Sequence, residues 1–134
     1  MDTSVAIPLL VVSHEAHTRV TLWAVGRVLR LSGHSVPETY SVLTRLPGDA
    51  RLAPADAVEL MEANFAEPLV LSPGKAQSVH QELALSGVAG GATYDGLVAL
   101  AAREHAAVLA TRDARARTTY EALGVTVEIV DAGR

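Results

Sequence analysis

Short runs rich in β-branched and apolar residues alternate along the chain with stretches whose apolar residues recur at helical spacing. The expected strands are Val28–Ser32, Pro68–Leu71, Val108–Thr111 and Val125–Val130. Such alternation is typical of a parallel sheet with crossover helices, so we expect an α/β sandwich with a mostly parallel sheet of about five strands. The fifth strand should end at Met1–Asp2, where almost all of it is missing. We expect either a strand reduced to its last residues or a chain whose full start lies further upstream.

The helical stretches are bounded by recognisable start and stop signals. Ser35-Val36-Pro37-Glu38 has the pattern of a capping box with proline in the first turn, and Gly124 lies where a helix C-terminus favours glycine. We expect helices from Ser13 to about Gly26, Ser35 to Leu46, Pro54 to about Phe65, Ser72 to near Gly87, Thr93 to near Ala106, and about Ala114 to Leu123.

Composition narrows the class of protein. The 134 residues are 49% hydrophobic with a net charge of -4, which predicts one folded domain over residues 1–134 and excludes disorder. The absence of cysteine excludes disulfides, thiolate metal sites and cysteine nucleophiles, and suits the cytoplasm. The longest apolar run, Val5–Val12, is too short for a membrane span, and the acidic second residue spoils a signal peptide. The acidic net charge argues weakly against a large nucleic-acid footprint.

Several common catalytic motifs are absent. No phosphate-binding glycine loop and no G-x-S-x-G nucleophile motif occurs, and Gly90-Gly91 is interpreted as a turn. His14-Glu15-Ala16-His17 has its histidines at i and i+3 rather than at i and i+4, and no third ligand is evident. We therefore interpret this segment as a solvated helix face near a loop.

Four carboxylates are expected at one edge of the sheet. Asp2 and Asp113 follow the ends of strands, whereas Glu38 and Asp95 lie in the first turns of helices that begin at the same edge. Ligands of parallel α/β sheets bind outside the carboxyl ends of the strands. Clustered carboxylates need a proton or a cation to relieve their repulsion, and several oxygen ligands favour Mg²⁺ or Mn²⁺ over zinc.

Each carboxylate also has a simpler explanation. Glu38 completes the capping box, and Asp95 in a first helical turn is favoured by the helix dipole. Asp113 is suited to capping the helix that follows it, and Asp2 to being an exposed terminal residue. Periodicity alone does not decide between these explanations and a shared cation site.

Four stretches in order resemble the PIN-domain ribonucleases, specifically the VapC-type toxins of bacterial toxin–antitoxin pairs. The stretches are Asp2-Thr3-Ser4, the segment from Pro37 to Leu46, the segment from Tyr94 to Ala101, and Thr111-Arg112-Asp113. The resemblance covers the whole chain. One departure is that the family has several apolar residues before the first aspartate, whereas here only Met1 precedes Asp2.

The resemblance implies a metal-dependent endoribonuclease with a PIN-like three-layer fold. It implies that Asp2, Glu38, Asp95 and Asp113 hold Mg²⁺ or Mn²⁺ and orient water for in-line attack on a phosphodiester. Ser4 and Thr111 match polar positions that support such a site. Similar proteins cut tRNA or ribosomal RNA, form homodimers and are neutralised by a VapB-like antitoxin whose tail fills the active-site groove.

Three arginines offer phosphate contacts near the predicted site. Arg112, Arg115 and Arg117 cluster beside Asp113, although a solvated helix face explains them equally well. Two other functions remain open: a PIN-like binding module that has lost catalysis and acts through partner contacts, and a small-molecule or phosphoacceptor α/β domain. Presence of all four carboxylates favours the ribonuclease.

Overall fold

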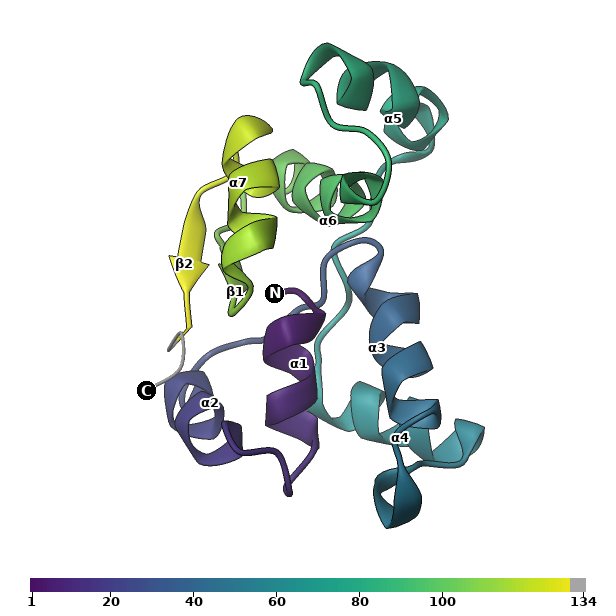
Figure 1. Cartoon of the computed structure of the whole chain (residues 1–134), viewed down its shortest axis with the longest axis vertical. Coiled ribbons are helices and arrows are strands. Elements are labelled where there is room, and N and C mark those ends of the chain that lie inside the picture. Colours follow the sequence, from purple (N-terminus) through teal and green to yellow (C-terminus); the bar gives the residue numbers. More distant parts are fainter. Residues whose placement is uncertain (131–134) are drawn as a thin grey trace.

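The computed structural model describes residues 1–130, which form a mixed α/β structure dominated by helices. The N-terminus lies between two halves of the molecule, one holding helices α1 to α4 and the other holding α5 to α7 with both strands (Figure 1). No helix in the described part of the chain is long and apolar enough to cross a membrane. The elements are α1 (Thr3–Leu10), α2 (His17–Ala24), α3 (Ser35–Thr44), the 3-10 helix η1 (Gly48–Ala50), α4 (Pro54–Asn64), α5 (Pro73–Leu85), α6 (Ala92–Glu104), β1 (Leu109–Thr111), α7 (Ala114–Ala122) and β2 (Val127–Ile129).

The regular sheet within residues 1–130 contains two strands, so the expectation of about five is not confirmed. Strand β1 pairs in parallel with β2, with Ala110 opposite Glu128, and α7 connects them. The expected strands Val28–Ser32 and Pro68–Leu71 are not regular strands: they share one isolated parallel bridge, Ser32 to Leu69.

The extended pair Met1–Asp2 bridges the 30–32 segment and β1 through two hydrogen bonds on one side and one on the other. The Met1 amino group donates to the Arg30 carbonyl at 2.8 Å, and Asp2 N–H donates to the Ala110 carbonyl at 3.2 Å. Because α1 already begins at Thr3, only two residues are extended here, and a regular ladder cannot develop. The five expected segments nevertheless lie in a continuous hydrogen-bonded series, and Asp2 lies near its centre.

The helix predictions are confirmed in position for α3 to α7 and wrong in two places near the N-terminus. No helix was expected over α1, which the Asp2 side chain caps by accepting a hydrogen bond from Ser4 N–H. Helix α2 begins at His17, without a side-chain cap, rather than after Ser13. The expected capping box at α3 is also wrong, because no side-chain hydrogen bond caps that helix and the buried Ser35 hydroxyl has no partner among the described residues.

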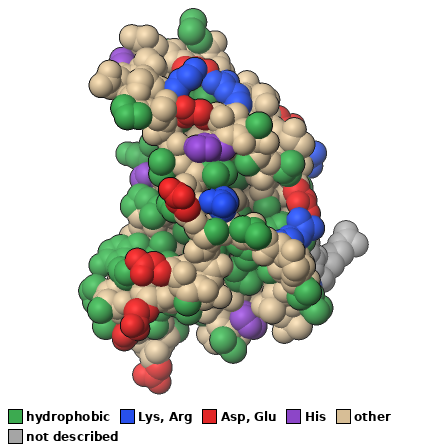
Figure 2. Space-filling model, turned by 180° about the vertical axis from the view of Figure 1, so that it is seen from behind, with side chains coloured by type: hydrophobic (Ala, Val, Ile, Leu, Met, Phe, Trp, Pro, Cys, Tyr) green, Lys and Arg blue, Asp and Glu red, His purple; other side chains and the backbone are tan. Residues whose placement is uncertain are grey.

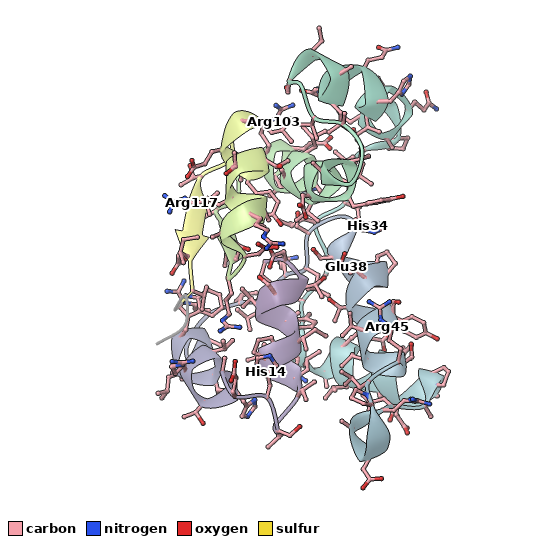
Figure 3. All side chains as sticks on the ribbon, viewed as in Figure 1. His14, His34, Glu38, Arg45, Arg103 and Arg117 are labelled. Carbon is pink, nitrogen blue, oxygen red and sulfur yellow. The ribbon has the colours of Figure 1, made fainter. Side chains whose placement is uncertain are left out.

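Buried aliphatic side chains hold α6 at the centre of one half of the molecule. Leu100 and Ala102 of α6 pack in one cluster with Leu109 of β1 and with Tyr120 and Leu123. The Arg103 side chain pairs with Glu82 of α5 and donates to the Leu123 carbonyl at 3.0 Å (Figure 3). The core is mostly Leu, Val and Ala as expected, with Tyr120 as a fully buried exception. This packing fixes α6 and α7 relative to β1.

Candidate active site

A cavity of about 330 Å³ lies where α1, α3, α6 and the β1–α7 connection meet. All four predicted carboxylates line it, although they come from four separate parts of the chain. Glu38 extends from the first turn of α3 (Figure 3). The lining consists of Asp2, Thr3, Ser4, Ile7, Pro8, His14, Glu38, Asp95, Val98, Arg112, Asp113 and Tyr120. The convergence expected from strand order is therefore present as a shared cavity.

Asp2 is the buried member of the four, with 5% of its surface exposed. Its Oδ1 accepts hydrogen bonds from Ser4 N–H at 3.0 Å and from the Ser4 hydroxyl at 2.6 Å. Its Oδ2 accepts from the Thr111 hydroxyl and from the Tyr120 hydroxyl, the latter at 2.8 Å. A buried carboxylate needs hydrogen-bond donors, and this many donors hold the Asp2 side chain in one orientation. The interpretation of Asp2 as an exposed terminal residue is wrong.

Ser4 and Thr111 also fix the loop that carries Asp113. The Ser4 hydroxyl accepts a hydrogen bond from Arg112 N–H at 2.7 Å, and the Thr111 hydroxyl accepts from Asp113 N–H at 3.0 Å. Asp113 itself caps α7 by accepting from Arg115 N–H at 2.9 Å, as one simpler explanation predicted. Capping uses Oδ1 and leaves Oδ2 without a hydrogen-bond donor among residues 1–130, so the same residue is able to serve the cavity.

The pKa of Asp95 reflects the electrostatics of the cavity. Partial burial, together with the charges of Asp113, Asp2 and Glu38, raises the pKa of the Asp95 carboxyl above its usual range, and His34 opposes this shift. A helix dipole acting alone at this first-turn position would lower the pKa. The repulsion among the four carboxylates and the burial outweigh the dipole. Glu38 is exposed and caps nothing, so its capping explanation is wrong.

The three arginines differ in their surroundings. Arg112 lines the cavity, and its Nε is buried without a hydrogen-bond partner among residues 1–130. Arg115 is exposed on α7, and Arg117 pairs with Glu121 at 2.6 Å on the side of α7 away from Glu38 (Figure 3). The face turned away from the viewer in Figure 1 carries acidic and basic groups interspersed with apolar ones, without a continuous basic surface (Figure 2). Of the three, Arg112 is best placed to meet an anion in the cavity.

Two residues of the site were missed in the sequence. Tyr120 donates to Asp2, and burial together with that carboxylate raises the pKa of its phenol above the usual range, so the hydroxyl stays protonated. A lone aromatic residue in the otherwise polar α7 was the available signal. His14 lines the cavity, and its Nδ1 accepts from Ala16 N–H at 3.0 Å. His14 and His17 are both half-buried, so the solvated-face interpretation of this segment is wrong.

The donor set fits a hard divalent cation in chemical type. Four carboxylates share a cavity with no ion pair to a basic side chain within residues 1–130. Burial raises the pKa of Asp95, and the charges of the other three carboxylates raise it further. A divalent cation relieves such repulsion and prefers oxygen ligands. In the described side-chain positions, however, no three carboxylate or imidazole groups lie close enough to share one ion. Cation binding therefore requires side-chain rotation, which the exposed Glu38 and Asp113 permit.

Comparison with known proteins identifies relatives over nearly the whole chain. The PIN domain matches residues 1–122. Ribonuclease VapC27 of Mycobacterium tuberculosis (strain ATCC 25618 / H37Rv) is 57% identical over 129 residues, which cover 96% of this chain and 94% of the relative. Ribonuclease VapC40 of Mycobacterium tuberculosis (strain CDC 1551 / Oshkosh) is 42% identical over 133 residues, covering 96% of each chain. The comparison with solved structures gave no match.

Proposed function

The chain belongs to the PIN-domain family, and because its relatives are VapC ribonucleases we propose that it is the toxin of a toxin–antitoxin pair and hydrolyses phosphodiester bonds in RNA. The observation that carries this proposal is the cavity in which Asp2, Glu38, Asp95 and Asp113 meet. We propose that these four side chains supply the oxygen ligands of a metal-dependent ribonuclease. A binding module without catalysis has no need to keep four mutually repelling carboxylates together.

We propose Mg²⁺ or Mn²⁺ as the cofactor, held by these four carboxylates. A cation bound there supplies a water of lowered pKa and neutralises charge that develops on the phosphate. Asp2 is the fixed ligand, because its hydrogen bonds from Ser4, Thr111 and Tyr120 hold its orientation before the cation arrives. The exposed Glu38 and Asp113 are the mobile ligands that complete the site.

The RNA phosphate is proposed to enter beside Arg112. Arg112 lines the carboxylate cavity. The planar guanidinium of an arginine suits a phosphate because it donates two parallel hydrogen bonds. Arg115 and Arg117 extend the positive charge along α7, with smaller contributions expected because they are exposed and Arg117 already pairs with Glu121. We propose tRNA or ribosomal RNA as the substrate and the cytoplasm as the place of action.

A VapB-like antitoxin is the proposed inhibitor, and a homodimer the proposed assembly. A carboxylate cavity that attracts a divalent cation also attracts a guanidinium, so an arginine in the antitoxin tail would compete with both the cation and RNA. Exposed apolar side chains on α2 and α4, Leu22 at 68% and Val58 at 44% exposure, support self-association through helices.

Purified protein, end-labelled RNA and Mn²⁺ test the function directly. We expect RNA cleavage that EDTA abolishes and that excess Mn²⁺ restores. We also expect the antitoxin encoded by the neighbouring gene to inhibit this cleavage. The matched control is Asp56→Asn, which removes an exposed carboxylate from the first turn of α4, away from the cavity. Cleavage that persists in EDTA would contradict the metal mechanism, and complete absence of cleavage with Mn²⁺ would favour the binding module.

A further inference from the structure

Two aromatic rings are in contact next to the carboxylate cavity. The rings of His34 and Tyr94 have centroids 4.9 Å apart and planes inclined by 30°. Tyr94 immediately precedes Asp95 in α6, and His34 immediately precedes the α3 helix that carries Glu38. His34 lies at the N-terminal end of that helix, above Glu38 in Figure 3. The ring pair therefore joins the start of α3 to the first turn of α6, the two helix starts that carry Glu38 and Asp95. His34 is near enough to Asp95 for its charge to affect the pKa of that carboxyl.

The segment that carries His34 is fastened to α6. The buried Ser32 hydroxyl donates to the Val98 carbonyl at 2.7 Å. Gly33 has φ +51°, and a Cβ at this position would approach the Leu97 carbonyl oxygen to 2.7 Å. Only glycine permits both this backbone conformation and this close approach. The two contacts hold the backbone that leads into His34 close to α6, which brings the His34 ring within reach of Tyr94.

Tyr94 is unusual among the aromatic residues because so much of its ring is open. It is 54% exposed, whereas Tyr120 is fully buried and Phe65 packs against the core. Tyr40 of α3 is also exposed, at 36%, so Tyr94 is the more exposed of the two. With His34 on one side, Tyr94 is able to offer its remaining ring surface to a planar ligand.

We propose that Tyr94, supported by His34, is a stacking platform for one unpaired RNA base next to the scissile phosphate. The proposal rests on the ribonuclease function and adds a residue-level basis for substrate choice. Every base has a π-face, so the platform tolerates many sequences, but a base inside a duplex is already stacked on its neighbours and is not available. The platform would therefore favour single-stranded loops over helical RNA.

Steady-state cleavage of an unstructured RNA pool in Mn²⁺ gives the first test. Tyr94→Phe keeps the ring and should leave KM within about twofold of the wild type. Tyr94→Leu keeps an apolar side chain without the ring, and KM should rise about tenfold with a smaller change in kcat. The control is Tyr40→Leu, which removes another exposed tyrosine, on α3 rather than on α6, and should leave KM unchanged. Melting curves confirm that each variant is folded.

A fluorescence measurement separates stacking from a structural role. RNA carrying 2-aminopurine at successive positions is bound to Glu38→Gln protein, which is expected to bind but not cleave. Quenching should occur at one position and be lost when Tyr94→Leu is added, but retained with Tyr94→Phe. Wild-type KM and unchanged quenching in Tyr94→Leu would overturn the platform while leaving the ribonuclease intact. Failure of the wild type to cleave any RNA would instead overturn the proposed function.

Discussion

Replacing Asp95 with asparagine tests whether this carboxylate is a cation ligand or serves only to stabilise its helix. The substitution keeps the size and shape of the side chain and removes one negative charge from a cavity with three others. In the absence of a divalent cation, the substitution has two opposing effects on the stability of the folded protein. Loss of a favourable helix-dipole interaction costs about 0.3–1 kcal/mol, while relief of repulsion stabilises the protein. Burial and repulsion together raise the pKa of Asp95, so removing the charge should stabilise the protein by more than the lost dipole interaction costs.

The expected result without metal is a small stabilisation that depends on pH. Asp95 is partly exposed, so solvent screening limits the gain to about 1 kcal/mol or less, or a rise in Tm of about 3 °C. Because the folded pKa lies above the ordinary value of 3.8, the folded protein binds its proton more tightly than the unfolded chain does. The wild type therefore loses stability as pH rises through the window between these values, and Asp95→Asn should lack this component. The advantage of the variant should vanish below about pH 3.8.

Adding Mn²⁺ should reverse the order of the two proteins. A cation at about 100 times its Kd stabilises the folded state by about 2.7 kcal/mol, which is about 8–10 °C in Tm for a domain of this size. The variant lacks one hard oxygen ligand, so its stabilisation should be much smaller and its RNA cleavage should fall by orders of magnitude. Thermal melts with EDTA and with Mn²⁺, and cleavage on the same preparation, measure all three quantities. A variant with wild-type cleavage and a wild-type Mn²⁺ response would refute this reasoning.

Three further predictions test the surroundings of the site. Tyr120→Phe removes one hydrogen bond to buried Asp2 and should lower the free energy of unfolding in urea by about 2 kcal/mol; no loss would contradict the role of this contact. Gly33→Ala should cost more than about 1 kcal/mol in the same assay, because the residue needs a positive φ and has no room for a Cβ; a neutral effect would show that the segment relaxes. Arg112→Ala should weaken RNA binding more than Arg117→Ala does, and filter-binding assays that gave the opposite order would contradict the assignment of Arg112 to the cavity.

The placement of Asp95 and Asp113 at one edge could be predicted because the order of the elements determines it. Asp113 follows β1, and Asp95 begins a helix that leads back into that strand, so both belong to one edge wherever the remaining chain goes. Strand order and helix polarity are encoded by local patterns that sequence periodicity detects. The shared cavity therefore followed from the elements, although its supporting side chains did not.

The N-terminal helix could not be predicted because its local sequence argues against a helix. The run from Val5 to Val12 is apolar and contains Pro8, which argues against a helix interior. In the structure, Asp2 caps the helix, and burial of Val5, Ala6 and Leu10 stabilises it. Tertiary packing outweighs local preference here, and the early start of α1 is also what limits the central extended segment to two residues.

Contacts between distant side chains account for the missed members of the site. Tyr120 meets Asp2 across most of the chain, and no local pattern indicates such a pairing. His14 enters the cavity because the loop after α1 turns back toward it, whereas its spacing from His17 suggested only a poor metal motif. The proposed capping role of Glu38 failed for a related reason: α3 is held by packing and needs no side-chain cap.

Anomalous diffraction from crystals soaked in Mn²⁺ tests the central claim most directly, because it locates the ion without reference to activity. We predict a peak inside the carboxylate cavity, at about 2.0–2.3 Å from oxygens of Asp2 and at least one of Glu38, Asp95 and Asp113, with the exposed ligands rotated toward the ion. The same soak of Asp95→Asn crystals should give a weaker peak. An empty cavity in fully soaked wild-type crystals, with Mn²⁺ bound only elsewhere on the surface, would contradict the account.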